Sequence, residues 1–533
     1  MKSYRNKVIA FSALWAVMLI AEGVLIFNLI HRQLLPTKYL ALIVVLLLLL
    51  WGITGAFLYY HGKRKHKTRR TVFNAFGCAL AVLGIVGSLF ATGALRQVHQ
   101  VIDDVTDIDK KTVAMTVYVR TADKARTLAD AADYTFLVPT AFDNKNTQNA
   151  LDALAKELGR EVKVLRGGTL NEMADLLLSG GADALLVNQT HFELLADHDE
   201  YADIYDKIRL LYETTVEDLE EATVLPEVMI NIAAKGDIDD PENPDDPGSI
   251  PDESGDVPPE TEPAPAMENL GAKNVTKDAF LLYVAGSDTR TQSLPYKTRN
   301  DVNLLLAVNP KTKTIQVVTT PRDSYLPDPK HSYKRDKLTH CGNGGIENSI
   351  AVLESLYGLH IDYYCHINFT GVVTVVDAIG GITVYSNTAY DREGMHIVKG
   401  NNTLNGTQAL LFARERYLLP NGDFDRGRNH IRILTAVFNK VASAKTLLRS
   451  YSSILSSIST MFRTSLSPSE IEALVRMQLD DMSQWKIESY AVDATGGWNY
   501  TATSPNAKRW VCYPKANSIK EAKKLLKKVL NID

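Results

Sequence analysis

Three long apolar runs at the start of the chain constrain its fold most strongly. They lie at about Val8–Ile30, Tyr39–Tyr60 and Val72–Leu95, and each has roughly the 20 residues that a helix needs to span a bilayer. A cleavable signal peptide is the competing interpretation. It fits poorly, because three runs follow one another and the first lacks a small-residue cleavage site ahead of a polar segment. We therefore expect residues 1–95 to form three transmembrane helices.

The distribution of charge predicts how these helices are oriented. The loop His61–Arg70 is rich in Lys and Arg, whereas the loop His31–Lys38 carries only Arg32 and Lys38. The positive-inside rule places the more basic loop in the cytoplasm. The expected localisation is thus the cell membrane, multi-pass, with a cytoplasmic N-terminus and with the domains after Leu95 extracytoplasmic.

One acidic residue, Glu22, lies inside the first apolar run. An acidic side chain within a bilayer is a candidate functional residue. Packing between helices next to a polar lumen is the alternative, and the sequence leaves both open.

Residues 96–235 are expected to stand between the membrane and a C-terminal domain. Residues 96–111 place apolar side chains at helical spacing, as in a juxtamembrane extension of the third span. Residues 112–235 alternate strand and helix, which predicts a small α/β accessory domain with a partly parallel sheet; within it, His191–Glu213 is expected to be helical. We find no catalytic cluster there, so the domain is interpreted as a spacer or a docking module for a protein partner. Residues 236–270 contain many Asp, Glu and Pro but no Lys or Arg, which indicates an extended linker.

The four cysteines argue against a disulfide scaffold and against a zinc site. The chain has no Cys-x-x-Cys pair, which is the usual spacing of zinc ligands. Three cysteines lie in the C-terminal domain, residues 271–533, so at most one bridge can form there. We predict that Cys341 pairs with Cys365, because the two flank one expected helix, and Cys512 is the competing partner.

Arg and Asp residues adjoin three predicted strands early in the C-terminal domain. The polar segments GSDTR, TRND and TPRDS stand next to the strands Phe280–Ala285, Val302–Val308 and Thr314–Thr319. Ligands of α/β sheets bind beyond the carboxyl ends of strands. These strand ends thus present charged side chains where such a sheet binds its ligand.

Two later segments, LNGTQALLFARERY and GDFDRGRNH, add more arginines. Arg is planar, always charged and bidentate toward phosphate. Several Arg beside two carboxylates suit a pyrophosphate with a bridging Mg²⁺, which prefers carboxylate and phosphate oxygens as ligands. The alternative is a set of Arg–Asp salt bridges on a solvated face.

Together with KLTH and the run INFTGVVTVVDAIGGITV, these segments follow one another in the order of the LytR-CpsA-Psr (LCP) family. The chain resembles this family from about Phe280 to the C-terminus. The resemblance implies a C-terminal α/β domain with a central mixed sheet. It also implies a Mg²⁺-dependent phosphotransferase of Gram-positive bacteria. Such an enzyme moves wall teichoic acid, capsule or a related glycan from a polyprenyl pyrophosphate carrier to peptidoglycan through a phosphodiester.

The resemblance assigns roles to individual residues. The implied metal ligands are Asp288 and Asp301, and the implied pyrophosphate-binding arginines are Arg299, Arg322, Arg414, Arg416 and Arg426. Further candidates are Asp323 as a base and, for substrate binding, Arg290, Lys337, Arg428 and His430. The family often has Gln at the position of His430. The histidine can donate a hydrogen bond similar to that of Gln, or it can titrate. Candidate walls for the polyprenyl tail are Ile350–Leu356, Leu410–Phe412 and Ile433–Val441.

The spacing of Arg414 and Arg416 gives a structural prediction. On a helix, residues two positions apart point about 200° from each other, so only one of the two could face a ligand. In an extended segment, alternate side chains share a face. We therefore expect the helix from Asn405 to end near Phe412 and Ala413–Tyr417 to be extended.

Three other functions fit parts of the sequence. A polyprenyl pyrophosphate phosphatase would use the same residues, with water as the acceptor. A non-enzymatic envelope sensor would rely on the accessory domain, but the clustered Arg and Asp residues argue against it. DNA binding is opposed by the expected topology, and we see no helix-turn-helix pattern on the cytoplasmic side, so no nucleic-acid partner is expected.

Overall fold

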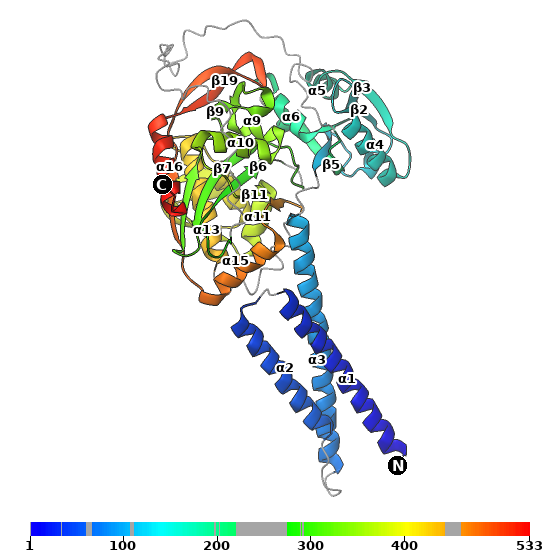
Figure 1. Ribbon diagram of the computed structural model, residues 1–533. Coiled ribbons are helices and arrows are strands. Elements are labelled where there is room, and N and C mark those ends of the chain that lie inside the picture. Colours follow the sequence, from blue (N-terminus) through cyan, green and yellow to red (C-terminus); the bar gives the residue numbers. More distant parts are fainter. Residues whose placement is uncertain are drawn as a thin grey trace.

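The computed structural model describes residues 2–32, 35–59, 67–106, 111–196, 199–201, 203–219, 274–287, 289, 293–442 and 460–532. Three long helices lie at one end of the molecule and two α/β bodies at the other (Figure 1). The expected linker, residues 236–270, lies outside the described residues. So do residues 61–66, which belong to the basic loop that predicts the membrane orientation.

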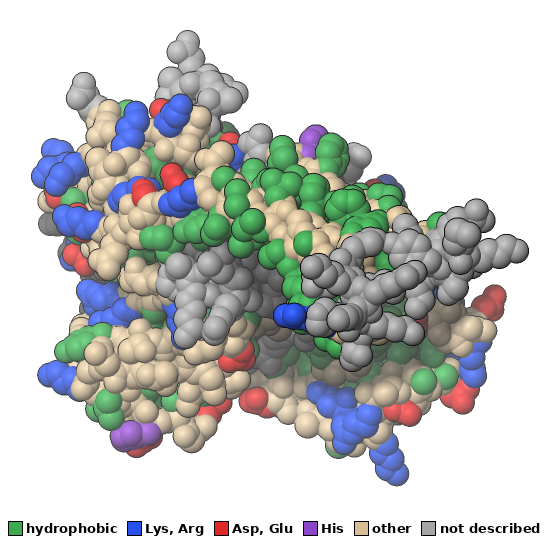
Figure 2. All heavy atoms as spheres, turned by 90° about the horizontal axis from the view of Figure 1, so that it is seen from below, with side chains coloured by type: hydrophobic (Ala, Val, Ile, Leu, Met, Phe, Trp, Pro, Cys, Tyr) green, Lys and Arg blue, Asp and Glu red, His purple; other side chains and the backbone are tan. Residues whose placement is uncertain are grey.

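Within the described residues, three helices are long and apolar enough to cross a membrane, as expected. They are α1 (Lys2–Arg32), α2 (Thr37–Leu58) and α3 (Lys67–Thr106). Seen from below, hydrophobic side chains gather in a broad band over these helices (Figure 2). The 40 residues of α3 extend about 60 Å at about 1.5 Å per residue, roughly twice the thickness of a bilayer core. The end of α3 therefore stands clear of the bilayer, and there His99 Nδ1 lies 3.3 Å from Glu472 Oε1 of the larger body.

Glu22 lies at the crossing of α1 and α3. Its side chain is buried, and a Cβ atom added to Gly84 of α3 would lie only 2.8 Å from its Oε1 atom. The glycine thus gives the carboxyl group the room it occupies. In the structure Glu22 is a residue of the packed helix interface.

The smaller body is built on a five-stranded sheet in the order β3-β2-β4-β1-β5. The neighbours β2, β3 and β4 run parallel, and β1 is antiparallel to β4 and β5. The sheet is thus partly parallel, as the sequence predicts. Its elements are β1 (Thr112–Arg120), β2 (Thr135–Pro139), α4 (Asn144–Leu158), β3 (Lys163–Gly167), α5 (Leu170–Ser179), β4 (Ala184–Asn188), α6 (Gln189–Ala196), α7 (Ile204–Lys207) and β5 (Ile208–Glu217).

The helix expected over His191–Glu213 is wrong in its C-terminal part. The segment from Ile208 to Glu217 is instead the edge strand β5, which pairs with the whole of β1. Most of its side chains are partly exposed, so its own apolar pattern is weak. The long-range pairing with β1 decides the conformation of this segment.

The larger body is built on a six-stranded mixed sheet in the order β16-β11-β6-β7-β8-β17. These strands are β6 (Phe280–Ser287), β7 (Asn300–Asn309), β8 (Thr314–Thr319), β11 (Tyr363–Asn368), β16 (Phe462–Thr464) and β17 (Lys486–Ala491). The three strands expected from the sequence are therefore confirmed as β6, β7 and β8. The helices of this body are α9 (Leu338–Cys341), α10 (Ile346–Tyr357), α11 (Phe369–Ala378), α12 (Gly406–Arg414), α13 (Asp423–Val441), α15 (Pro468–Asp481) and α16 (Ala516–Leu530).

The described part of the larger body also contains four two-stranded pairs. They are β9 (Tyr325–Pro327) with β10 (Arg335–Lys337), β12 (Ile382–Ser386) with β15 (Gly400–Leu404), β13 (Tyr390–Arg392) with β14 (Met395–Ile397), and β18 (Ala494–Thr501) with β19 (Ser504–Pro514). The β18–β19 hairpin follows β17 directly in the sequence.

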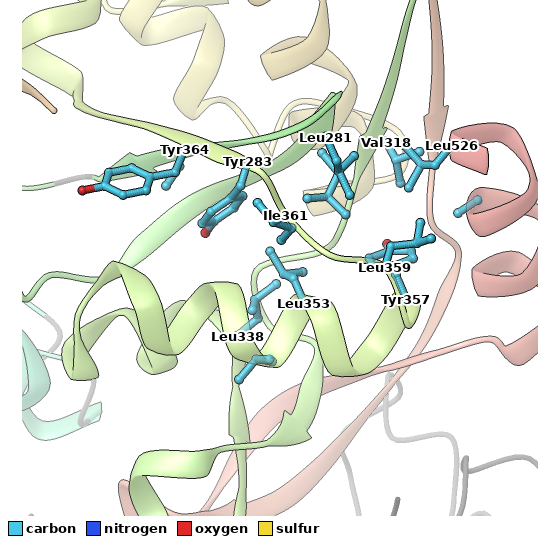
Figure 3. Close-up of a cluster of buried hydrophobic side chains, with 14 of the residues drawn as sticks. Leu281, Tyr283, Val318, Leu338, Leu353, Tyr357, Leu359, Ile361, Tyr364 and Leu526 are labelled. Carbon is cyan, nitrogen blue, oxygen red and sulfur yellow. The ribbon is translucent and has the colours of Figure 1, made fainter. Parts of the chain in front are cut away.

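Helices cover both faces of the central sheet, which explains why its inner strands are almost continuously apolar. Along β6, alternate side chains enter opposite cores: Leu281 and Tyr283 lie in one cluster and Phe280 in the other. Figure 3 shows the first cluster, where the strand side chains meet Leu353 and Tyr357 of α10. The second cluster packs against α13 and α15. The sheet is therefore a rigid support for the residues at its edge.

The expected bridge between Cys341 and Cys365 is wrong. All four cysteines are described, and none forms a disulfide. The Cys341 thiol lies 3.4 Å from Lys337 O, and the Cys365 thiol lies 3.5 Å from Thr464 Oγ1. The two residues flank α10 in sequence but belong to different surroundings in the fold.

Candidate functional site

Strand order brings the charged segments to one edge of the larger sheet. Because β7 is antiparallel to β6 and β8, its first residues lie beside the last residues of both neighbours. Asn300 pairs with Ser287 at the end of β6, and Leu304 pairs with Thr319 at the end of β8. The segment that opens β7 and the one that follows β8 therefore meet, as the sequence analysis expected.

Asp301 is the anionic centre of this edge. Its Oδ2 atom accepts a hydrogen bond from Arg322 Nη1 at 2.7 Å, and its Oδ1 atom accepts one from Thr339 Oγ1 at 2.9 Å. The carboxyl group is almost completely buried, and burial alone would raise its pKa. The positive charges of Arg322, Arg299 and Arg426 instead lower this pKa well below its usual range. Asp301 is thus a permanently ionised carboxylate.

Asp323 contacts two cationic side chains of the site, Arg322 and Lys337. Its Oδ2 atom lies 3.6 Å from Arg322 Nε, and its Oδ1 atom lies 3.3 Å from Lys337 Nζ. Burial opposes ionisation here too, but Arg322 and Lys337 hold the pKa of Asp323 below its usual value. A carboxylate held so firmly by two cations is a weak base. Its geometry fits the positioning of Arg322 and Lys337 better than proton abstraction.

A pocket opens beside this cluster, with a volume of about 360 Å³ when its solvent-open mouth is included. Its walls come from β7, the end of β8, α13 and the end of β17. They include Asp301, Asn303, Arg322, Arg426, His430 and Val492. The lining thus combines apolar surface with two buried or half-buried guanidinium groups, those of Arg322 and Arg426, which can bind an anionic ligand.

His430 joins α13 to α12. Its Nε2 atom lies 3.0 Å from Ala413 O, and because a carbonyl only accepts, Nε2 carries the proton. Burial, together with the charge of Arg426, lowers the pKa of His430 to about 3. Asn429 Nδ2 donates in addition to Phe412 O at 3.2 Å. Of the two roles left open by the sequence, the structure favours hydrogen-bond donation by a neutral His430, which a Gln could also perform.

The start and end of α12 set the positions of Arg414 and Arg416. The helix starts with a capping box, in which Asn405 Oδ1 accepts from Gln408 N at 2.9 Å and Gln408 Oε1 accepts from Asn405 N at 3.0 Å. It ends two residues later than expected, because Arg414 is still helical and Glu415 is the first extended residue.

The expectation that Ala413–Tyr417 is extended is therefore wrong at both ends. Ala413 and Arg414 are helical, and Tyr417 lies in a turn. Glu415 is buried and accepts from Arg392 Nη1 at 2.7 Å, so the chain bends where this carboxylate is held. Contacts with residues outside the segment, rather than alternation within it, fix its shape.

Arg414, Arg416 and Arg428 are not among the residues that line the pocket, and two further candidates lie outside the described residues. The guanidinium group of Arg416 lies 4.5 Å from the centroid of the Tyr417 ring. Arg428 Nη1 lies 2.6 Å from Asp425 Oδ1. Asp288 and Arg290 are not among the described residues. No cluster of three or more His, Cys, Asp or Glu that could hold a metal occurs in the described part of the chain.

The accessory domain contacts the site at Arg299, which belongs to the larger body. Arg299 Nε lies 3.7 Å from Glu193 Oε2 of α6, and Glu193 also accepts from Gln189 Nε2 at 2.9 Å. Just before Arg299, Lys297 Nζ lies 2.8 Å from Asp218 Oδ2. Sequence reasoning found no chemistry in the accessory domain and missed Glu193, for which no local signal exists.

Thr339 and His340 lie in the segment KLTH, and the sequence alone gives them no role. His340 Nδ1 lies 2.7 Å from Asp336 Oδ1, and Asp336 Oδ2 accepts from Thr503 N at 2.7 Å. His340 and Asp336 are both buried. This network fixes the short α9 helix that carries Thr339 to Asp301.

The candidate walls for a lipid tail divide into two groups. Ile350–Leu356 lies in α10, and its most buried side chains, such as Leu353, belong to the core on one face of the sheet. Leu410–Phe412 and Ile433–Val441 lie in α12 and α13, whose side chains pack in one shared cluster. The expected walls therefore do not form one continuous surface.

Comparison with known protein families agrees with the motifs. The model described as the LytR_cpsA_psr family matches residues 259–528, just over half of the chain. The chain belongs to this family. The accessory domain and the three membrane helices lie outside the matched residues.

Several relatives carry the name polyisoprenyl-teichoic acid–peptidoglycan teichoic acid transferase TagU. The protein from Bacillus anthracis is 32% identical over 204 residues, which is 38% of this chain and 66% of the relative. The one from Enterococcus faecalis is 30% identical over 222 residues, or 41% of this chain and 72% of the relative. The crystal structure of B. subtilis TagV is 24% identical and aligns with a TM-score of 0.41, covering 48% of this chain and 99% of TagV.

Proposed function

We propose that this protein transfers a phospho-glycan, such as teichoic acid, capsule or a related glycopolymer, from a polyprenyl pyrophosphate carrier to peptidoglycan. The observation that carries the proposal is the buried cluster of Asp301 with the charges of Arg322, Arg299 and Arg426, beside a pocket that Asp301, Arg322 and Arg426 line. Family membership and the names of the relatives support the choice of substrates.

The reaction is a phosphoryl transfer, in which positioning and charge stabilisation dominate. A sugar hydroxyl of the acceptor attacks the phosphorus on the glycan side of the pyrophosphate. A new O–P bond forms, the O–P bond to the carrier phosphate breaks, the hydroxyl proton passes to solvent, and polyprenyl phosphate leaves. Arg322 and Arg426 stabilise the charge on the phosphate oxygens, while Asp301 and Asp323 hold Arg322 in place from two sides.

The proposal includes a Mg²⁺ ion. Mg²⁺ is bound by one or two carboxylates together with substrate phosphates, and Asp301 is an ionised carboxylate at the pocket wall. In this proposal Asp301 and Asp288 hold the ion, which neutralises phosphate charge when bound. Arg290, Lys337, Arg414, Arg416 and Arg428 remain candidates for contacts with the phosphates or the glycan.

The membrane helices fit a substrate whose polyprenyl tail stays in the bilayer. The proposal requires a cytoplasmic N-terminus and both α/β bodies on the outer side, where peptidoglycan lies. It also requires that α3 hold the larger body close to the membrane surface, in keeping with the contact of His99 with Glu472.

The test uses the full chain in proteoliposomes with a lipid-linked glycan, Mg²⁺ and purified peptidoglycan. We expect labelled glycan to become covalently attached to peptidoglycan, and Arg322→Lys to lower the rate strongly because Lys lacks the planar fork. Release of free phosphorylated glycan without attachment would identify a pyrophosphate phosphatase instead. Absence of both products with active lipid substrate would reject the enzymatic proposal.

A further inference from the structure

The β18–β19 hairpin carries an unusual exposed aromatic surface. Trp498 is 57% exposed, Tyr500 44% and Trp510 43%. Trp498 and Trp510 are directly paired across the two strands, with ring centroids 5.8 Å apart at an interplanar angle of 78°. Large aromatic groups gathered on a surface commonly mark a binding site. We call Trp498, Tyr500 and Trp510 the aromatic platform.

The strands hold the platform in a fixed orientation. A Cβ atom added to Gly496 would lie 2.1 Å from Trp510 Cζ2, so the Trp510 ring lies against the backbone of β18 where only glycine leaves room. Side chains of successive strand residues point to opposite faces. Val511 and Tyr513 therefore occupy the other face, where Val511 is buried and Tyr513 packs on Tyr325 at 5.8 Å between centroids. The hairpin thus has an inner face and a separate outer aromatic face.

The base of the hairpin is part of the wall of the site. Ala491 and Val492, which precede β18, line the pocket beside Asp301. On the returning strand, Cys512 N donates to Asp323 O at 2.7 Å. Trp498 stands four residues beyond Ala494, about 13 Å at roughly 3.3 Å per residue. The hairpin therefore starts at the pocket, and the platform lies farther along it, at about the length of a short oligosaccharide.

Its position excludes a bilayer as the natural ligand. Trp and Tyr also gather at membrane interfaces. However, β19 lies at the end of the larger body that is opposite the membrane helices α1, α2 and α3 (Figure 1). A sugar ring suits the platform, because the C–H groups on one face of a pyranose pack against the negative face of an aromatic ring. Lys508, whose Nζ lies 6.0 Å from the Tyr500 ring centroid, adds a donor for sugar oxygens at the same place.

We propose that the aromatic platform binds the glycan strand of the acceptor and directs one of its hydroxyl groups into the pocket at Asp301. This inference rests on the proposed transfer to peptidoglycan and deepens it. The ligand class is a chain of linked amino sugars, contacted by ring stacking rather than by charge.

The experiment compares Trp498→Ala and Trp510→Ala with wild type and with Tyr385→Ala, which removes an equally exposed aromatic ring from β12. Each full-length variant is measured for sedimentation with purified peptidoglycan sacculi, and in proteoliposomes for the dependence of transfer on acceptor and on lipid donor. We expect each tryptophan variant to bind sacculi about tenfold more weakly and to raise the acceptor KM by about tenfold. Tenfold corresponds to about 1.4 kcal/mol, the scale of one lost aromatic contact. The donor KM and the kcat at saturating acceptor should stay unchanged, and Trp498→Phe should recover most of the binding.

The sacculus assay needs no catalysis, so the inference stays testable even if the chain transfers nothing. Unchanged sacculus binding and acceptor KM in both tryptophan variants, with thermal unfolding equal to wild type, would overturn it. Loss of binding to vesicles of anionic lipid, with sacculus binding retained, would overturn it in favour of a membrane surface. If the alanine variants unfold, the same comparison is made with Trp498→Phe and Trp498→Gln, of which only the second should lose binding.

Discussion

Replacing His430 by Gln tests the reading of this residue as a neutral hydrogen-bond donor. In the folded protein, burial and the charge of Arg426 lower the pKa of His430 to about 3. In the unfolded chain an imidazole titrates near pH 6.5. Gln can donate the same bond to Ala413 O but does not titrate in this range.

The magnitude follows from proton linkage. Between about pH 6.5 and pH 3 the unfolded state binds one proton at His430 that the folded state excludes. The free energy of unfolding therefore falls by about 1.4 kcal/mol for each pH unit below 6.5. The loss is absent above pH 6.5 and levels off near pH 3. At pH 5 it amounts to about 2 kcal/mol, and His430→Gln should not show it.

The assay measures the unfolding free energy of the detergent-solubilised chain at pH 7 and at pH 5, for wild type and for His430→Gln. We expect the drop between the two pH values to be about 2 kcal/mol smaller in the variant. His366, whose pKa burial also lowers to about 3, contributes equally to both proteins and cancels.

An equal drop in wild type and His430→Gln would refute the reasoning, since it would mean that His430 can accept a proton in the folded state. Transfer at pH 7 should survive the substitution. A loss of transfer with normal stability would show that the imidazole itself contacts the substrate.

Three further predictions follow from the site and the membrane helices. Arg322→Lys should lower transfer by about 10²–10³-fold, as for loss of one transition-state donor; a rate near wild type would reduce Arg322 to a source of general positive charge. Asp301→Asn should abolish Mg²⁺-dependent transfer and lower the unfolding free energy by about 3 kcal/mol, because Arg322 loses its buried partner; chemical denaturation with a transfer assay measures both, and full activity would remove Asp301 from the metal site. A reporter that works only outside the cytoplasm should be active after Asp109 and silent at Lys65, and the reverse pattern would contradict the expected orientation.

Much of the fold was readable from local sequence. The membrane spans depend on the length of apolar runs, and β6, β7 and β8 on continuous apolar runs that end in polar residues, so both were found correctly. The capping box at Asn405 likewise marks the start of α12. Where a segment's own pattern was weak, as in Ile208–Glu217, the prediction failed, because pairing with a distant strand supplied the missing energy.

The sequence by itself thus determined which charged segments belong to the site, since Asp301 and Arg322 stand at strand ends that any such sheet brings together. The sequence could not determine which groups these charged side chains contact. The contact of Glu193 with Arg299 joins residues from two domains. Burial of His430 beside Ala413, together with the charge of Arg426, keeps the imidazole neutral, and Gly496 makes room for a tryptophan on the facing strand. Each depends on side chains far apart in the chain. Local periodicity contains no information about such pairs, and only the packed tertiary structure sets the distances and the burial from which their energies arise.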